Sequence, residues 1–516
     1  MHVGGRKLET AVGIQWGDLF ALVLYFGAVL LIGFWCSTRL KDTECYFVGG
    51  RKLPGWAVGI SMLGTAISSV TFLAYPGSAY AMNWSRLVPG LMLPIAAIAA
   101  IYLFVPFYRK ARLVSAYEYL ELRFGAWARV YGCIMWSVAQ FYRMGIILFL
   151  LALPVKSMTG FDLYSIIIVM GILVTIYTVL GGIEAVIWTD VMQTIVLLLG
   201  GLFCIATVFI EVPGGPGTVI AKALENGKFD LAFSFEWNFA EDTFWVLVLN
   251  GLFLFLQEFA SDQTKIQRYC AAKNDKAARN AVWIGGVGCI PVWATFMFVG
   301  TCLWVYYQTF PETIVDQIRS DQVFPHFILT QLPLGLAGFV IAAVMAAAMS
   351  SIDSCMNGSA TVITSDLYRR HLAPGRQDGH YLNVARFVTA LAGVLMIICS
   401  LLLTQIREDT ILDIGFFIAA IFSAGLGGLF FLGFISKRTN SQGAAIGIVL
   451  TVLVTIWLTF SELGWLPEAY SSRIHKFIIN FFSNMVAFVV GYFASYLFPK
   501  PNQEKLANLT WWTVKN

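Results

Sequence analysis

One interrupted apolar stretch decides how this chain folds: Gly-Ile-Ser-Met-Leu-Gly-Thr-Ala-Ile-Ser-Ser-Val-Thr-Phe-Leu-Ala-Tyr-Pro-Gly, residues 59–77. The stretch is long enough to cross the ~30 Å hydrocarbon core of a bilayer. Its glycines, serines and proline nevertheless disfavour an unbroken helix. Unwound backbone at membrane depth is tolerated only where it lines a cavity or is buried in protein. The stretch therefore predicts a discontinuous membrane helix beside a binding site.

The rest of the composition indicates a membrane protein. Hydrophobic residues make up 58% of the chain and charged residues 12%, whereas soluble domains carry about 25% charged residues. Apolar stretches of roughly 20 residues recur from end to end and predict an all-α polytopic protein with about thirteen transmembrane helices. We expect a multi-pass protein of the plasma (inner) membrane, in contact with lipids.

Charged residues give the expected orientation. The loops between alternate predicted spans hold most of the 34 Lys and Arg residues, and such loops face the cytoplasm. The N-terminus is thus expected outside and the C-terminus inside. The net charge of +4 reflects this topology, so no nucleic-acid partner is expected.

A second span, residues 249–263, is interrupted in the same way. It lies five predicted spans after the first, so the two cross the membrane in opposite directions. This is the pattern of inverted repeats that each begin with a broken helix. The alternative, ordinary kinks with packed serines, is less favoured because corresponding positions of both halves are affected.

A polar cluster interrupts the apolar stretch 346–360. On a helix, one face carries Ala347, Ser350, Ser351, Ser354 and Gly358. Such a set of oxygens suits a small dehydrated monovalent cation. A carboxylate at mid-bilayer is costly, so Asp353 needs a partner or a proton. Asp190 opens another span at a similar depth, and a cation between the two carboxylates would relieve both.

Arg143 is the only basic residue that the predicted spans place near mid-membrane. A guanidinium there either binds a charged solute or forms an internal ion pair, for example with Glu258. Solute binding is favoured, and bidentate carboxylate recognition is the chemistry that a guanidinium performs best.

The motifs of other function classes are absent from the sequence. Nucleotide-binding loops, metalloprotease helices and serine-hydrolase elbows do not occur. An enzyme is therefore not expected. A passive channel or a solute sensor remains as a less favoured alternative, as does an intramembrane enzyme that would use Asp190 and Asp353.

Four motifs together resemble the sodium:solute symporter family. They are Tyr46-Phe-Val-Gly-Gly-Arg51, the block from Gly181 to Gln193, Gln267-Arg-Tyr269, and Ser350-Ser-Ile-Asp-Ser354 followed by Asn357. The resemblance implies a LeuT-like core of five plus five inverted helices. It divides the chain into residues 1–55 with one extra helix, the transport core 56–435, and residues 436–516 with two further helices.

The resemblance also implies sites. The common sodium site would use the carbonyls of Gly64, Ile67 and Ala347 and the hydroxyls of Ser350 and Ser351. A second sodium site would use Asp190, Ser350, Asp353 and Ser354. Similar members show a serine at position 353, so the second site could be tighter, could admit a proton, or could be altered.

Solute-binding positions follow from the same resemblance. Arg143 corresponds to an arginine that holds the substrate carboxylate in sialic-acid symporters, and Ser68 and Thr71 resemble solute-contacting positions. Glu258 falls where sugar-transporting relatives have a gating tyrosine. We therefore expect sodium-coupled import of a small carboxylate-bearing solute, such as a sialic acid, a sugar acid or a monocarboxylate. A neutral sugar is the alternative.

Overall fold

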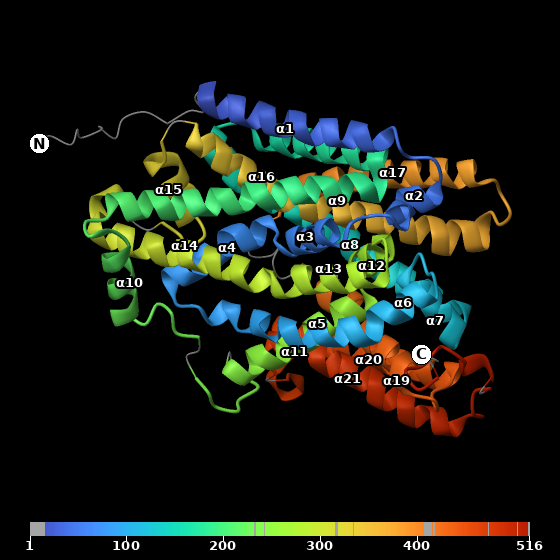
Figure 1. Cartoon of the computed structure of the whole chain (residues 1–516). Helices are drawn as coiled ribbons and strands as arrows, with labels where there is room; N and C mark the ends of the chain where they lie inside the picture. The colour runs from blue at the N-terminus through green and yellow to red at the C-terminus, as the bar shows by residue number, and fades with distance from the viewer. Residues whose placement is uncertain are drawn as a thin grey trace, which may run out of the picture.

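The computed structural model describes residues 16–231, 234–241, 243–314, 318–333, 335–406, 415, 418–472, 474–502 and 504–513, and these residues are almost entirely helical. Most of the long helices lie roughly parallel to one another (Figure 1). The principal elements are α1 (Trp16–Ser37), α2 (Thr43–Val48), α3 (Gly55–Ala66), α4 (Ser69–Ala81), α5 (Leu93–Ala99), α6 (Val105–Lys110), α7 (Ala116–Phe124), α8 (Ala126–Thr159), α9 (Leu163–Glu211), α10 (Gly215–Glu225), α11 (Phe244–Ser261), α12 (Gln263–Ala271), α13 (Asp275–Val287), α14 (Cys289–Thr309), α15 (Val323–Gln331), α16 (Leu336–Val362), the π-helical η6 (Ile363–Leu372), α17 (Asp378–Leu403), α19 (Leu426–Ile435), α20 (Ser441–Glu462) and α21 (Lys476–Ala494).

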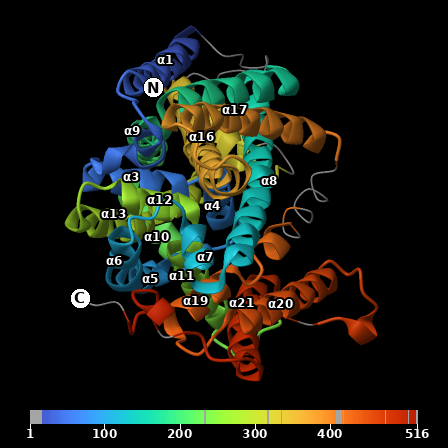
Figure 2. The same cartoon turned by 90° about the vertical axis from the view of Figure 1, so that its right-hand side faces the viewer.

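Eleven helices of the described chain are long and apolar enough to cross a membrane. One of them, α9, has 49 residues, which at 1.5 Å per residue is far longer than one ~30 Å span needs. Gly182 divides it, with a φ of 57° and a ψ of −151°. A Cβ at Gly182 would lie 2.7 Å from the backbone oxygen of Tyr46, so only glycine fits. The two arms leave this bend in different directions (Figure 2) and correspond to two separately predicted spans, 161–180 and 190–210.

The first broken helix is where the sequence predicts it. Helices α3 and α4 are inclined by 57° to each other. Between them, Ile67 (φ −109°, ψ 98°) and Ser68 (φ −92°, ψ 171°) are extended. Gly64, Thr65 and the following residues thus present backbone groups that no continuous helix would leave available.

The second broken helix consists of α11 and α12. Asp262 separates them with an extended backbone (φ −80°, ψ 121°) and accepts a hydrogen bond from the amide of Thr264, which caps α12. The two broken helices are also tied together at one end. The amide of Leu53 donates to the carbonyl of Ala271 at 3.1 Å, and that of Lys273 donates to the carbonyl of Leu53 at 2.9 Å.

Helix α16 lies at the centre and packs against α3, α8, α9 and α12. Its first turn is capped by α1, because Asp18 accepts hydrogen bonds from the amides of Gly335 (3.0 Å) and Gly338 (2.8 Å). The start of α1 therefore lies at the same end as the start of α16. The last described residues lie at the opposite end, where Tyr119 of α7 donates to the carbonyl of Leu509. With the start of α1 and the last described residues at opposite ends, the chain between them crosses the membrane an odd number of times. Which end faces the cytoplasm stays a prediction.

Candidate functional site

The five residues of the expected common cation site gather where α3 ends against the middle of α16. The hydroxyl of Ser350 donates to the carbonyls of Gly64 (3.1 Å) and Ala347 (3.3 Å). The hydroxyl of Ser351 donates to the carbonyl of Thr65 at 3.3 Å. Ile67 lies two residues after Thr65, and its amide donates to the carbonyl of Gly64 at 3.0 Å. The hydrogen bonds of the two serine hydroxyls are long, so these oxygens could reorient to coordinate an ion. All the candidate ligands are oxygens, which a small hard cation prefers.

Asp190 lies against this cluster and is bound by Arg268 of α12. The guanidinium Nη2 lies 2.9 Å from Asp190 Oδ2, which also accepts from the hydroxyl of Ser61 at 2.5 Å. Arg268 further donates to the hydroxyls of Thr65 (2.8 Å) and Ser354 (2.6 Å). Both charged side chains are at most 1% exposed. The positive charge expected beside Asp190 is therefore supplied by the protein itself.

The other oxygen of Asp190 is unsatisfied. Asp190 Oδ1 and the nearby hydroxyl of Thr194 are buried and have no hydrogen-bond partner among the described residues. A Cβ on Gly64 would lie 2.5 Å from this hydroxyl and 3.8 Å from the Cβ of Asp190. The hydroxyl of Thr194 thus lies against Gly64, and two buried oxygens beside the carbonyl cluster have no partner among the described residues.

Asp353 is fully buried and directly precedes Ser354 on α16. Its Oδ2 accepts a hydrogen bond from the hydroxyl of Tyr177 at 2.7 Å, and its Oδ1 lies 3.3 Å from the hydroxyl of Ser354. Ser354 also donates to the carbonyl of Ser350 at 2.8 Å. The four residues of the expected second site are thus neighbours, and a phenol rather than a basic residue accompanies Asp353 in the described chain.

Arg143 is in the middle of α8 and is exposed, although it lies within electrostatic reach of Asp262 and Glu258. Among the described residues, the side chains of Arg143 and Glu258 form no ion pair or hydrogen bond. The alternative of an Arg143–Glu258 ion pair is therefore not realised in this structure. The guanidinium is accessible and free to bind an external group.

A cavity of ≈ 460 Å³ lies between α4, α8 and α15. Its lining includes Leu73 and Ala74 of α4, Leu150 and Ser157 of α8, and Gln322, Pro325 and His326 at α15. Arg143, Leu150 and Ser157 are spaced by seven residues and share one face of α8. Arg143 therefore lies about two turns deeper than the cavity wall.

Ser68 and Thr71 are also half-buried at the start of α4. Ser68 is the residue before the helix, but its hydroxyl caps no amide of α4. Thr71 and Ala74 share a face of the helix, and Ala74 lines the cavity. Thr71 therefore lies one helical turn before the cavity-lining residue Ala74 on α4, and Ser68 lies three residues before Thr71.

The sequence prediction missed Arg268 and Lys265. Both are buried on α12, so Arg143 is not the only basic side chain in the core. Both follow the second interrupted span, so the apolar pattern places them in a loop. Arg268 does lie in the Gln267-Arg-Tyr269 motif, but its partner on α9 is 78 residues away in sequence and the motif gives no sign of it.

Comparisons with known proteins agree with this geometry. The profile of the sodium:solute symporter family matches residues 46–451. The sodium/sialic acid symporter NanT of Aliivibrio fischeri is 31% identical over 93% of each chain. The sodium/sialic acid symporter SiaT of Proteus mirabilis is 32% identical over 93% of this chain and 95% of that one. A Na⁺-coupled sialic acid symporter, solved in a substrate-bound outward-open state, superimposes with a TM-score of 0.88 at 30% identity, covering 95% of this chain and 99% of that chain.

Proposed function

The chain belongs to the sodium:solute symporter family, and from that premise we propose that it imports a carboxylate-bearing sugar of the sialic-acid kind. It is a multi-span, LeuT-like membrane transporter coupled to sodium, and not an enzyme. The solute, its contacts and the number of sodium ions are the parts that this proposal adds.

Arg143 is the observation that carries the proposal. It is accessible, lies beyond a cavity open towards one end of the molecule, and has no ion-pair partner in the described chain. An unpaired guanidinium in the core of a membrane protein is costly. A carboxylate of the solute would form two parallel hydrogen bonds with it and neutralise it.

Polar groups around Arg143 suit the rest of a sialic acid, which carries hydroxyl and amide groups. Ser68 and Thr71 can donate or accept hydrogen bonds. The carboxylate of Glu258, which has no partner among the described residues, accepts them from hydroxyls. A carboxylate at 258 does not provide the apolar face on which a sugar ring stacks. This difference disfavours, though only mildly, the alternative of a neutral-sugar symporter.

We assign the common sodium ion to the carbonyls of Gly64, Ile67 and Ala347 and the hydroxyls of Ser350 and Ser351. The ion would draw the end of α3 onto α16, since its ligands come from both elements. Because α4 follows α3 after only two extended residues, a fixed α3 also fixes Ser68 and Thr71. Sodium binding would in this way favour the conformation that binds the solute.

We assign a second sodium ion to Asp190, Ser350, Asp353 and Ser354. The support is the orphaned Oδ1 of Asp190 and the contact between Ser354 and Asp353. Among the described residues, Arg268 pairs with Asp190 only, while Asp353 has the neutral Tyr177 hydroxyl as its partner. One carboxylate charge is therefore left over for a cation.

Uptake by the purified protein in liposomes tests the proposal. An inward sodium gradient should drive accumulation of N-acetylneuraminic acid above its external concentration, and a potassium gradient of equal size should not. Accumulation of glucose instead would favour the neutral-sugar alternative. Equilibration without accumulation would indicate a passive channel.

A further inference from the structure

The side-chain nitrogen of Gln267 on α12 is surrounded by three oxygen acceptors. Its Nε2 lies 2.6 Å from the carbonyl oxygen of Phe47, 2.7 Å from Asn357 Oδ1 and 3.0 Å from Thr361 Oγ1. A carboxamide nitrogen carries only two hydrogens, so it cannot satisfy three acceptors fully at once. These three oxygens, from α2 and α16, surround the nitrogen much as they would surround a small cation; we call them the oxygen cage.

Two polar atoms at the cage have no partner. Gln267 Oε1 and Asn357 Nδ2 make no hydrogen bond among the described residues, and their residues are 1% and 0% exposed. A buried unsatisfied group costs about 1–3 kcal/mol. A cage that served only to join helices would be expected to satisfy these groups, whereas one that exchanges its occupant cannot satisfy them in every state.

The cage adjoins the proposed second sodium site. Arg268, which contacts Asp190 and Ser354, is the residue next to Gln267. Ser354 precedes Asn357 by three residues and therefore lies on the neighbouring turn of the same face of α16. An ion that leaves Ser354 along this face meets the cage next.

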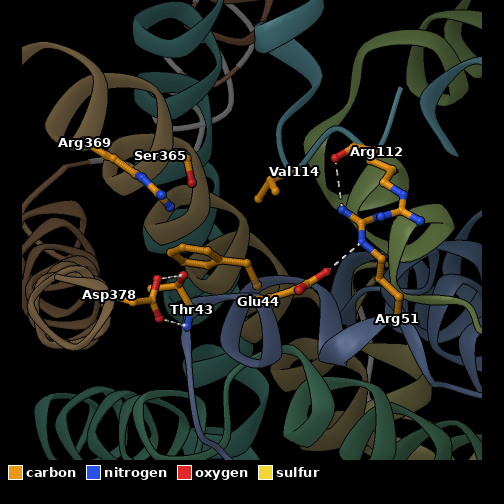
Figure 3. A pocket seen from close by; sticks show the side chains of 9 residues that line it. Thr43, Glu44, Arg51, Arg112, Val114, Ser365, Arg369 and Asp378 are labelled. Carbon is orange, nitrogen blue, oxygen red and sulfur yellow. Dashed lines mark hydrogen bonds and ion pairs between the residues drawn. The ribbon is translucent and has the colours of Figure 1, made fainter. Parts of the chain in front are cut away.

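On its other side the cage adjoins a second cavity. Phe47, whose carbonyl belongs to the cage, lines a cavity of ≈ 360 Å³ together with Ser365, one turn beyond Thr361. Figure 3 shows Ser365 and Arg369 on one side of this cavity and Glu44 and Arg51 on the other. The cavity is at the end of the molecule where the last described residues lie, which is the predicted cytoplasmic end.

We propose that the oxygen cage is a transient sodium site on the route by which the ion leaves Asp190 and Ser354 for this cavity, and that the Gln267 carboxamide closes the route by occupying the cage. The inference rests on the sodium coupling of the proposed function but not on the identity of the solute. One face of α16 and η6 then carries the whole route, through Ser350, Ser354, Asn357, Thr361 and Ser365. When the carboxamide rotates away, the three oxygens become available to the ion.

Sodium flux in the absence of solute tests the route. In sodium-loaded liposomes, Gln267→Met keeps the side-chain volume but removes the occupying amide. It should release sodium several-fold faster than the unmodified protein and lower solute accumulation. Thr361→Val keeps the shape but removes one cage oxygen, so it should lower the maximal uptake rate without changing the external sodium concentration for half-maximal uptake. Ser359→Ala, buried on the opposite face of α16, should behave like the unmodified protein.

Measuring whether sodium raises the unfolding temperature distinguishes a failure of the sodium assignments from a failure of the cage proposal alone. If the unmodified protein shows no such rise, the sodium assignments of the proposed function fail. If the variants keep the rise but Gln267→Met does not leak and Thr361→Val transports at the normal maximal rate, the cage proposal alone is overturned. Should Gln267→Met not fold, normal turnover of Thr361→Val is sufficient to overturn it.

Discussion

Arg268 and Asp190 form an ion pair of 2.9 Å in which neither side chain is more than 1% exposed. The pair joins the inner half of the second broken helix to α9. Ser61 and Thr65 of the first broken helix bond to the same guanidinium. Both broken helices are therefore fastened to a single charge pair, and any movement that separates them must disturb it.

Asp190→Asn should strongly destabilise the protein. The substitution leaves the Arg268 guanidinium buried without its counter-charge, and breaking a buried pair on one side costs about 3–5 kcal/mol. Thermal unfolding in sodium-free detergent solution measures this, so that loss of sodium binding does not contribute.

Glu184→Gln is the matched control on the same helix. Its ion pair with Arg39 is longer, 3.7 Å, and partly exposed, so its loss should cost at most about 1 kcal/mol. Adding Arg268→Gln to Asp190→Asn should recover part of the stability, because no charge is then left unpaired. Equal shifts for Asp190→Asn and Glu184→Gln would contradict this interpretation.

Ser351→Ala should raise the sodium concentration needed for half-maximal uptake by a large factor. The change removes one oxygen of the common site without altering the helix. Ser359→Ala removes a buried hydroxyl from the same helix and should leave that concentration unchanged. Uptake by Ser351→Ala with an unaltered sodium dependence would show that the common site is elsewhere.

The broken helices could be predicted from sequence because their causes are local. Gly64 and Ser68 are poor helix formers within an apolar run, and the structure breaks the helix between Ala66 and Ser69, whereas Pro76 lies inside the continuous helix α4. The face formed by Ser350, Ser351 and Ser354 likewise follows from helical spacing alone. Its contact with Gly64 was expected only because the family resemblance paired the two.

The long-range contacts could not be predicted in this way. Arg268 meets Asp190, and Tyr177 meets Asp353, across separations of 78 and 176 residues. No spacing rule links such positions. The division of α9 into two spans was predicted, but its form was not, since one glycine with a positive φ joins the two arms and no loop does.

The acid stability of the protein should depend on Glu121 of α7. Burial raises its pKa, but hydrogen bonds from Arg129 and Arg370 outweigh burial, so that the pKa of Glu121 is lowered overall. A carboxyl group with a lowered pKa in the folded state contributes stability above its unfolded pKa of ~4.3, and this is lost as the pH falls through the folded value.

Glu121→Gln should therefore flatten the dependence of the unfolding temperature on pH below ~4.3. Glu225→Gln, at an exposed glutamate of α10, is the control and should leave the dependence as it is. A Glu121→Gln profile parallel to that of the unmodified protein would rule out this contribution.

Arg143→Lys should weaken solute binding strongly while leaving expression and folding intact. Lysine keeps the charge but lacks the planar pair of donors that fits a carboxylate. Binding of N-acetylneuraminic acid can be followed by calorimetry with the sodium concentration held constant. Normal binding by Arg143→Lys would remove this residue from the solute site. A lowered unfolding temperature of Arg143→Lys together with normal solute binding would instead indicate a structural role for the guanidinium.

Uptake of an anionic solute should carry net positive charge inward. One sodium ion with a monoanion is electroneutral, whereas two sodium ions move one elementary charge, which is worth about 2.3 kcal/mol per 100 mV. A current induced by solute and a sodium Hill coefficient above one are therefore expected.

Ser354→Ala removes a hydroxyl of the second site without breaking the Asp190–Arg268 pair. It should lower the coefficient towards one and reduce accumulation more than binding. Asp353→Ser removes the other carboxylate. It should keep the current if the second sodium ion binds mainly through Asp190 and Ser354, and abolish it if Asp353 is the principal ligand. Electroneutral uptake by the unmodified protein, with a coefficient of one, would leave no place for a second ion.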